Sequence, residues 1–469
     1  MKTDLSKLEK YNHIITGFGS NILGNLLMFA MTIFLTRTYD PAVYGEFRLL
    51  FSFVALAVIL FLFGRDSGII YYSQQEEKEK KNIIRDEVFY GFLILICGTA
   101  LLYASSGLII KNFLNDTISQ RNYYIALSII PIWGFFNLLL AGIKANGMIN
   151  YSFLLSNLIQ RSLRVPFFIV LSLVSTSYIS LALSMILSQL ILVYLAIKKI
   201  PFILNVSKIN YQGFFTRFKY SFQLGFNTII VVLLAKIDII MIGKYTSVKD
   251  VAIYDVSSML AFVIMLPFVA LVKSSEPIMK ALVYDKKTQN KYRNNLKLAI
   301  ELSFGILLVY TLSGKELLSI FGSSYIVGYE SLLVLSTSFV ILVMLGTPIE
   351  ILNMNGYAKK SAYILIASII INIILNFILI PIYGIVGASV ATGTSLVFSK
   401  LVALKFVGEL NFKTIYKVDN FKVYILFSIF IIIGQLFYKT HIIYSFIYTI
   451  IVFILYILSI FLLRNYYGK

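Results

Sequence analysis

The stretch FQLGFNTIIVVLLAKIDIIMIGKYTSVKDVAIY, residues Phe222–Tyr254, decides the fold. It consists of an apolar run, a short polar turn around Thr246, and the start of a second apolar run. A helix needs about 20 apolar residues to cross the hydrocarbon core of a membrane, and the first run has that length. The same outline appears earlier, where LTRTYDPAVYGEF at residues 35–47 joins the first long apolar run to the second. The pattern indicates pairs of membrane-spanning helices joined by short turns.

Repeated landmarks predict that this pattern arose by duplication. Arg37 aligns with Lys244, and Phe47 with Tyr254, at a common offset of 207 residues. A second landmark agrees, because the dipeptide at 146–147 (Asn-Gly) recurs at 355–356, an offset of 209 residues. Self-similarity at a nearly fixed spacing is the signature of a repeated structural unit. Two halves of the chain are therefore expected to share one helical arrangement.

Composition places the chain in the membrane. Of its 469 residues, 59% are hydrophobic and 13% charged, with a mean hydropathy of +0.85, whereas soluble domains carry roughly 25% charged residues. We predict an all-α polytopic membrane protein with about 14 transmembrane helices, in two pseudo-twofold-related six-helix lobes around a central cavity plus two C-terminal helices. The expected spans are 14–36, 47–63, 88–110, 122–143, 151–174, 178–197, 221–243, 251–272, 295–313, 328–352, 361–382, 384–407, 421–438 and 442–463.

The basic residues predict how the chain is oriented. With the N-terminus inside, the cytoplasmic segments hold 30 Lys and Arg and the external segments 8, of 41 in all. Cytoplasmic loops of membrane proteins collect Lys and Arg, so both termini are expected in the cytoplasm. The same bias explains the net charge of +19 without nucleic acid as a partner. The predicted parts are a cytoplasmic N-terminus (1–13), an N-lobe (14–198), a cytoplasmic linker (199–220), a C-lobe (221–407), and helices 13–14 with the C-terminus (408–469).

Signatures of soluble enzymes do not occur in the sequence. We find no GxxxxGK[ST] loop for nucleotide phosphates and no HExxH zinc helix. The two histidines, His13 and His441, lie far apart, and Cys97 is the one cysteine, so we expect neither a metal site nor an intramolecular disulfide. The chain is predicted to have no cofactor and no catalytic residue.

Ionisable residues at membrane depth are the candidates for function, because they are costly there. Arg161 and Arg164 are three residues apart and share one face of the fifth span. Guanidinium groups can hold phosphate or diphosphate through paired hydrogen bonds, so the two side chains are candidate substrate ligands facing a wet cavity. The alternative is that the span begins later and both side chains reach the cytoplasmic interface.

The other candidates are spread along the chain. Lys236 and Asp238, two apart in the seventh span, point to different sides of the helix and are candidates for substrate contact, with an interhelical ion pair as the alternative. Arg65 stands at the inner mouth after the second span, either as a substrate ligand or as part of a solvated pair with its neighbour. Asn25 is a candidate cavity residue or a helix-packing amide. Asp238 and Glu350 are candidates for coupling to an ion, with an ordinary carboxylate at the membrane interface as the favoured alternative for Glu350.

Four motifs in order carry a resemblance to a known family. They are RTYDPAVYGEF (37–47), KIDIIMIGKY followed by VAIY (236–254), KELLSIFGSSY (315–325) and LNFILIPIYGIVGASVATGTS (375–395). Across residues 14–407 the chain resembles the polysaccharide transporter (Wzx-like) oligosaccharide flippases of the multidrug/oligosaccharidyl-lipid/polysaccharide exporter superfamily. Asp238 matches that family's acidic position in the seventh helix. The chain departs from the related lipid II flippases in having fewer arginines in its first two helices, which disfavours the peptidoglycan precursor as substrate.

The resemblance implies a function and partners. It implies a flippase that moves an undecaprenyl-diphosphate-linked oligosaccharide from the inner to the outer leaflet by alternating access, for O-antigen, capsule or teichuronic-type polysaccharide. It also implies coupling to a Na⁺ or H⁺ gradient, a bacterial cytoplasmic membrane, contact with membrane lipid, and polymerase or chain-length proteins as further partners. The alternatives are a cation-coupled multidrug antiporter and, ranked below it, a membrane polysaccharide polymerase or ligase, a class that usually needs larger external loops than this chain has.

Overall fold

The computed structural model describes residues 19–20, 23–114, 117–205, 214–275, 279, 285–409, 429 and 449–459. Every regular element in these residues is a helix, which confirms the predicted all-α membrane fold. Nine of the described helices are long and apolar enough to cross a membrane, and Leu23–Thr38 and Thr449–Ser459 are shorter apolar helices. The predicted segment 1–13 and nearly all of the predicted span 421–438 lie outside the described residues.

The chain forms two compact units, residues Met1–Lys249 and Asp250–Lys469. This division differs from the predicted linker at 199–220, because α10 (Phe214–Tyr245) packs against α2 and α3 within the first unit. Helix α10 contains the predicted seventh span, which had been assigned to the C-lobe. The two units are defined by packing and the predicted lobes by the sequence repeat, so the predicted lobe boundaries stay a prediction.

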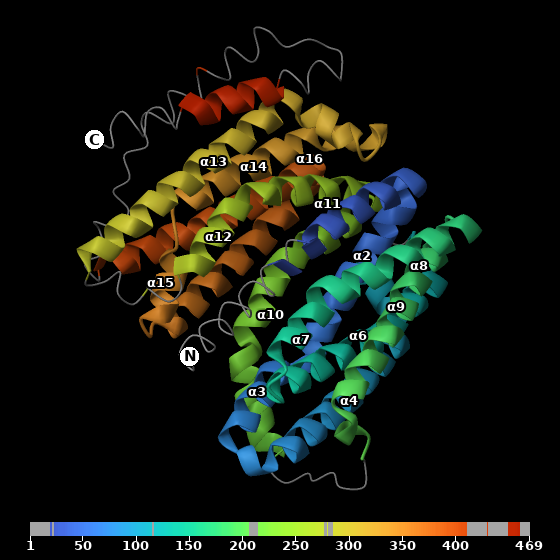
Figure 1. Ribbon diagram of the computed structural model, residues 1–469. Helices are drawn as coiled ribbons and strands as arrows, with labels where there is room; N and C mark the ends of the chain where they lie inside the picture. The colour runs from blue at the N-terminus through green and yellow to red at the C-terminus, as the bar shows by residue number, and fades with distance from the viewer. Residues whose placement is uncertain are drawn as a thin grey trace. The chain divides into compact units, whose positions relative to one another are not determined.

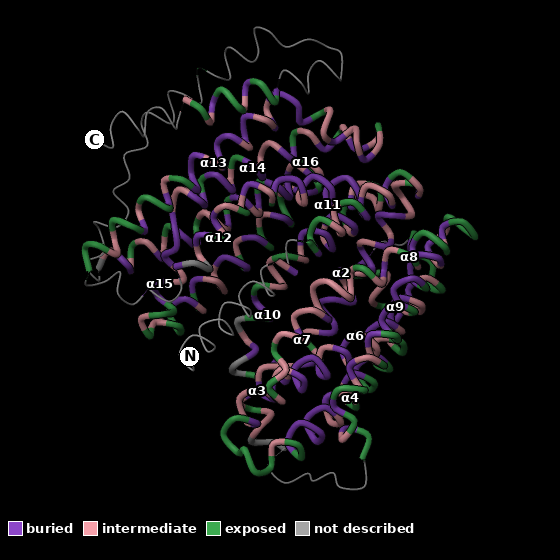
Figure 2. The backbone as a smooth tube through the Cα atoms, in the orientation of Figure 1, coloured by how far each residue is buried: buried purple, intermediate pink, exposed green. Residues whose placement is uncertain are grey.

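The first unit is a bundle of antiparallel helices (Figure 1). Helix α6 has buried residues along its length, from Tyr123 to Ala145, and packs against both α4 and α9 (Figure 2). Helices α2 and α3 also pack against α6. The described elements of this unit after Leu23–Thr38 are α2 (Pro41–Leu62), α3 (Arg65–Gln75), α4 (Lys80–Ala104), α5 (Ser106–Phe113), α6 (Gln120–Ala145), α7 (Ile149–Phe153), α8 (Gln160–Val174), α9 (Tyr178–Lys199) and α10.

Local sequence explains where α2 begins and ends. Asp40 caps its N-terminus, accepting a hydrogen bond from the backbone N–H of Ala42 at 2.8 Å, and Pro41 fills the first helical turn. The predicted span began six residues later, at Phe47, because the capping turn was read as a loop. The helix ends at Phe63 and Gly64, two consecutive residues with left-handed backbone, and α3 starts directly after them.

The two Asn-Gly landmarks occupy equivalent turns. Gly147 follows α6 with φ +91°, and Gly356 follows α15 (Pro348–Met354) with φ +87°. In each turn the residue after the glycine donates its backbone N–H to a carbonyl five residues earlier, from Met148 to Ile143 at 3.1 Å and from Tyr357 to Leu352 at 2.9 Å. This hydrogen bond is the mark of a Schellman helix end, which needs a residue with positive φ. The sequence repeat therefore corresponds to a repeated local structure.

The second unit contains α11 (Val248–Phe262), α12 (Leu266–Ser275), α13 (Lys286–Ser319), α14 (Tyr329–Met344), α15, α16 (Ala358–Glu409) and the helix Thr449–Ser459. Helix α11 begins two residues ahead of the boundary between the units. Helix α16 bends at Gly384, which has φ +55° and follows Pro381, so it provides the two predicted spans 361–382 and 384–407. Asp285 caps α13, and hydrogen bonds from the Thr288 side chain and from the backbone hold the pKa of its carboxyl below the usual value.

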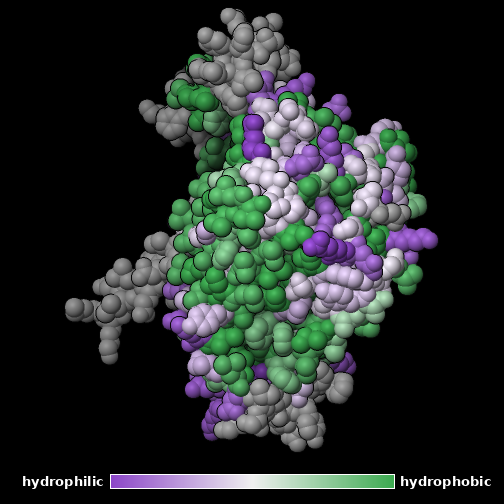
Figure 3. Space-filling model, turned by 90° about the vertical axis from the view of Figure 1, so that its right-hand side faces the viewer, coloured by the Kyte–Doolittle hydropathy of each residue, from purple (hydrophilic) through white to green (hydrophobic). Residues whose placement is uncertain are grey.

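Apolar side chains are exposed on the outside of the helices. In α8 and α9 they include Leu173, Val174, Leu183 and Leu190. Figure 3 shows a broad apolar surface on the face turned to the viewer, with hydrophilic residues above it, below it and along its right-hand side. An apolar area of this extent is a lipid-facing surface in a chain with this many spans.

Candidate functional site

The structure brings together three of the predicted site residues in the first unit. Arg161 of α8 donates from Nη1 to the side-chain oxygen of Asn25 at 2.6 Å. Arg164, one turn further along α8, is buried with 7% exposure, and the positive charge of Arg161 acts on it. The predicted sharing of one helix face by the two arginines agrees with this arrangement, and the contact of Asn25 with an arginine had not been anticipated.

Near this site the helix Leu23–Thr38 lies very close to the segment that contains Asn157 and Arg161. A β-carbon at Gly24 would lie 2.4 Å from the carbonyl oxygen of Asn157 and 2.8 Å from Nη1 of Arg161, so the helix Leu23–Thr38 can reach the site only with glycine there. The segment Leu154–Ile159, directly before α8, is π-helical. Single turns of π-helix occur often at functional sites, because the extra residue turns the side chains that follow it.

A third arginine joins the site from α2. Arg48 lies close enough for its positive charge to act on Arg164, and its guanidinium stands 5.8 Å from the centre of the Phe51 ring. We refer to Arg48, Arg161 and Arg164 as the arginine cluster. Sequence reasoning missed Arg48, because it was counted with the external segments although it stands at the start of the predicted span 47–63. The signal that could have placed it is the N-cap at Asp40, which starts α2 at Pro41 and so puts Arg48 well inside the helix.

The two arginines of α8 are held by amides and not by carboxylates among the described residues. Among the described residues, neither Arg161 nor Arg164 forms an ion pair with a carboxylate. When the Gln160 amide is turned so that its oxygen faces Arg164, Nη2 of Arg164 donates a hydrogen bond to that oxygen at 2.8 Å. The buried Nε of Arg164 has no hydrogen-bond partner among the described residues. A buried donor without a partner is costly, so this nitrogen marks a place where an anion would be stabilised.

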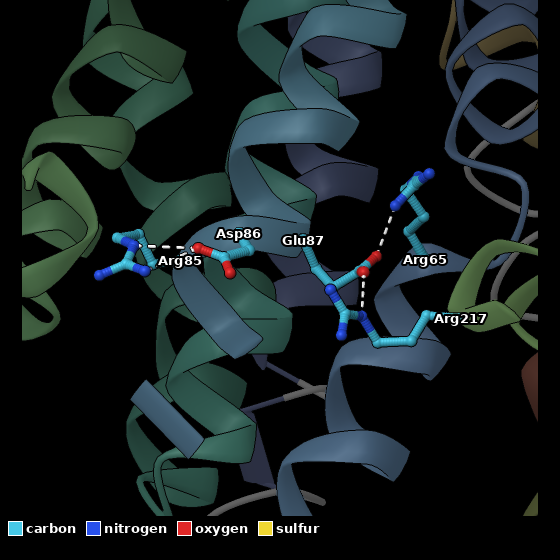
Figure 4. Close-up of polar contacts among 5 residues, drawn as sticks. All are labelled: Arg65, Arg85, Asp86, Glu87 and Arg217. Atoms are coloured by element: carbon cyan, nitrogen blue, oxygen red, sulfur yellow. Dashed lines mark hydrogen bonds and ion pairs between the residues drawn. The ribbon is translucent and has the colours of Figure 1, made fainter. Parts of the chain in front are cut away.

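Arg65 lies in a different setting from the one predicted. It is fully buried and donates from Nη1 to Glu87 of α4 at 2.5 Å, while Arg217 of α10 donates from Nε to the other oxygen of the same carboxylate at 2.8 Å (Figure 4). The neighbouring Arg85 and Asp86 pair with each other at 2.8 Å (Figure 4). Glu87 and Arg217 had not been singled out from the sequence. The role of Arg65 as a substrate ligand stays a prediction, since its guanidinium holds Glu87 in place.

A pocket of about 230 Å³ lies beside the α2–α3 break, within the first unit. Its polar lining includes Asp66, Asn137, Lys144 and Thr228. One acidic and one basic side chain with an amide and a hydroxyl can bind water or a sugar hydroxyl. The remaining lining residues are apolar or glycine: Ile59, Leu62, Gly64, Ile70, Leu140, Ala141, Gly225 and Ile229.

The other predicted residues are placed as follows. In α10, Asp238 is buried and Lys236 half-buried. In the second unit, Glu350 is half-buried in the first turn of α15, and its Oε2 is buried without a hydrogen-bond partner among the described residues. The negative charge of Glu350 acts on the ammonium of Lys400 in α16. Lys400 is another residue that sequence reasoning missed, since it was counted with the cytoplasmic lysines although the predicted span 384–407 contains it.

Two relatives and several solved structures are similar to the chain. It is 29% identical over 177 residues to "Probable flippase AglR" of Haloferax volcanii, a match that covers 36% of this chain and 37% of that protein. It is 34% identical over 109 residues to "Probable low-salt glycan biosynthesis flippase Agl15" of the same organism, which covers 23% of this chain and 22% of that one. The matched segments thus span about a third of AglR and less of Agl15.

The structural similarity covers more of the chain. It superposes on "Lipid II flippase MurJ, inward closed conformation" with a TM-score of 0.70 at 17% identity, over 97% of this chain and 99% of that one. It superposes on an inward-facing multidrug resistance MATE family transporter of the MOP superfamily with a TM-score of 0.65 at 15% identity, over 86% and 99% of the two chains. At these identities the likeness establishes a shared fold.

Two family matches complete the comparison. The MatE family matches residues 224–378. The family described as "Polysaccharide biosynthesis protein" matches residues 12–283, which is more than half of the chain. The protein therefore belongs to the polysaccharide biosynthesis protein family, which confirms the resemblance inferred from its motifs.

Proposed function

We propose that this protein is a flippase that moves an oligosaccharide linked to undecaprenyl diphosphate from the inner to the outer leaflet of a bacterial cytoplasmic membrane. The chain belongs to a transporter family and is not an enzyme. It is a multi-pass membrane protein. The observation that carries the proposal is the arginine cluster, in which a buried Arg164 lies beside two like charges and its Nε has no hydrogen-bond partner among the described residues.

Electrostatics connects the arginine cluster to a diphosphate. Like charges brought together in a place of low dielectric constant repel one another strongly, and an anion between them relieves the repulsion. Guanidinium is suited to this role because its planar set of donors can bind two phosphate oxygens at once. A diphosphate offers two or more negative charges to the cluster. The polyprenyl tail would stay in lipid while the charged head group passes along the protein.

The second candidate is a cation-coupled multidrug antiporter, which the similarity to a MATE transporter supports. Transporters of cationic amphiphiles need acidic or aromatic groups in the substrate path. The arginine cluster would repel such substrates, so we favour the flippase. A polymerase or ligase is disfavoured by the family to which the chain belongs.

Transport by alternating access would need a source of energy, and two acids are candidates for it. Asp238 of α10 is buried, and Glu350 of α15 has a buried oxygen with no hydrogen-bond partner among the described residues. We propose that one or both take up Na⁺ or H⁺ during the cycle, with Lys236 contacting the substrate. Both termini would lie in the cytoplasm, as the distribution of Lys and Arg predicts.

The experiment is flipping of a fluorescent undecaprenyl-diphosphate oligosaccharide in proteoliposomes. We expect Arg161→Ala/Arg164→Ala to lower the rate by about 10²-fold or more, since each lost charge-assisted pair with phosphate is worth roughly 1.5–3 kcal/mol. Arg161→Lys/Arg164→Lys keeps the charges and is expected to retain part of the rate. Arg121→Ala, at an exposed arginine of α6, is the matched control.

The outcomes separate the alternatives. A folded double-alanine variant with an unchanged rate would leave a flippase whose diphosphate site lies elsewhere. A wild-type protein that flips no lipid-linked sugar but takes up cationic dyes in exchange for Na⁺ or H⁺ would favour the antiporter.

A further inference from the structure

A buried ammonium group lies inside the second unit. Lys400 of α16 is 8% exposed, and its Nζ donates to the backbone carbonyls of Leu342 at 2.9 Å and Gly346 at 2.6 Å. The same nitrogen stands 4.2 Å from the centre of the Phe268 ring of α12. These lengths are those of charge-assisted hydrogen bonds, and the ring face adds a cation–π contact.

The carbonyl groups are available because α14 ends here. We call residues 345–347, between α14 and α15, the α14–α15 break. The backbone N–H of Gly346 donates to the carbonyl of Val343 at 3.0 Å and not to that of Leu342, and Gly346 has φ +67°. The last carbonyls of a helix lack partners within the helix and carry partial negative charge. The α14–α15 break therefore presents oxygens toward a single point, as backbone carbonyls do around a bound cation.

A carboxylate faces the same region from α15. Glu350 lies close enough for its charge to stabilise the Lys400 ammonium, and its Oε2 is buried without a hydrogen-bond partner among the described residues. On α13, Tyr292 is buried and hydrogen-bonds to Thr347 of the break at 2.7 Å, and the charge of Glu350 also acts on it. Four helices, α12 to α15, thus contribute carbonyl oxygens, a carboxylate, a tyrosine and an aromatic ring to the surroundings of Lys400 of α16.

We propose that the α14–α15 break is a binding site for a monovalent cation, and that the side chain of Lys400 is the cation that occupies it. A lysine ammonium matches K⁺ and NH₄⁺ in charge and approximately in size. Its covalent attachment to α16 removes the entropy loss that binding a free ion would incur. With Lys400 in place, repulsion excludes a second positive charge from the two carbonyls, so uptake of Na⁺ or H⁺ by Glu350 would require the Lys400 ammonium to leave them first.

The chemistry has a consequence for variants. If the amine is removed and the space is left open, the two carbonyls remain as oxygen ligands, and Glu350 supplies a negative charge within electrostatic reach of them. Oxygen ligands of this kind bind K⁺, NH₄⁺ or Na⁺. Lys400→Ala should therefore convert a site filled by a side chain into one filled from solution. Lys400→Met keeps most of the side-chain volume and should leave no room for an ion.

The test is thermal unfolding of the purified full-length protein in detergent, in chlorides of K⁺, NH₄⁺, Na⁺ and choline at equal ionic strength. We expect the midpoint of Lys400→Ala to be higher in K⁺ and NH₄⁺ than in choline, by on the order of 2–4 °C, and to rise with ion concentration. The wild type and Lys400→Met should show no difference between K⁺ and choline. Lys400→Ala/Glu350→Gln should lose the K⁺ effect, because the carboxylate has gone.

Several results would overturn the proposal. It fails if Lys400→Ala does not distinguish K⁺ from choline, or if the wild type responds to K⁺ as strongly as the variant. It also fails if Lys400→Met folds while Lys400→Ala cannot be purified even in K⁺. Should neither variant fold, Glu350→Gln decides: a buried ammonium deprived of its counter-charge should lower the midpoint, and an unchanged midpoint would refute the site. The readout is stability, so the test is independent of whether the protein flips a lipid.

Discussion

Glu87 is a single carboxylate that holds two arginines from different helices. It is 1% exposed, and each of its oxygens accepts a hydrogen bond, from Arg65 of α3 and from Arg217 of α10. Removal of one member of a buried charge network leaves the others desolvated and unpaired, which is the costly case for buried ion pairs. Glu87 therefore joins α3, α4 and α10 in one buried charge network, which is destabilised when any one of its members is removed.

We predict that Glu87→Ala destabilises the first unit by about 3–5 kcal/mol, because Arg65 is left buried without its carboxylate. The measurement is denaturant or thermal unfolding of the full-length protein in detergent. Glu77→Ala, at an exposed glutamate between α3 and α4, is the control and should change stability by less than about 0.5 kcal/mol. A loss below about 1 kcal/mol for Glu87→Ala, the range of a surface pair, would contradict a buried role.

At the scale of elements, the crossing of the α2–α3 break with α10 depends on two glycines. A β-carbon at Gly225 would lie 2.2 Å from the Cα of Gly64, and one at Gly64 would lie 2.5 Å from the Cα of Gly225. Such contacts are with backbone atoms, which cannot rotate away. Small residues at helix crossings allow backbones to approach closely in membranes, where packing drives association.

Gly225→Ala is accordingly expected to force α10 away from α3 and to destabilise the protein by about 1–3 kcal/mol or more. Gly107→Ala is the matched control, because a β-carbon at Gly107 in α5 would meet nothing within 4 Å. That variant should be neutral or slightly stabilising, since alanine favours helix over glycine. Equal stability of both variants in an unfolding measurement would show that the crossing is looser than described.

Hydrophobic length and turn chemistry were sufficient to predict most helices. The spans 122–143 and 178–197 correspond to α6 and α9, because each has about 20 apolar residues between polar turns. The prediction was weaker where the end of a helix does not coincide with a change from apolar to polar sequence. It placed the start of α2 at Phe47 instead of Pro41, and it joined α14 and α15 into one span, 328–352. The break at Gly346 and Pro348 interrupts an apolar run that hydropathy alone cannot divide.

At the scale of the whole molecule, the side of the membrane on which each turn lies is a testable prediction. The distribution of Lys and Arg puts the turn after α3 in the cytoplasm and the turn between α8 and α9 outside. With Cys97→Ser as background, Thr176→Cys should react with a membrane-impermeant maleimide in intact cells. Gln75→Cys should react only after the membrane is opened. Both positions are exposed, so reactivity reports sidedness. The reverse pattern would invert the predicted orientation.

The candidate site was partly predictable for a physical reason. A charge at membrane depth is expensive, so Arg161, Arg164 and Asp238 stand out in any apolar run. The partners of such charges come from other helices, and sequence distance hides them. Asn25 is 136 residues from Arg161, and Lys400 lies 54 residues from Gly346, whose carbonyl it binds. Backbone carbonyls carry no sequence signal, which is why the partners of Lys400 could not be foreseen.

The Glu87 network also bears on how the chain is assembled during synthesis. Arg65 and Glu87 are 22 residues apart on neighbouring helices, whereas Arg217 is 130 residues beyond Glu87. When α3 and α4 leave the translocon, their two opposite charges can neutralise each other, which lowers the cost of inserting both. One carboxylate oxygen then waits for a donor until the ribosome has made α10. The remaining charge of Glu87 can then attract Arg217 and so help to place α10 against α3 and α4.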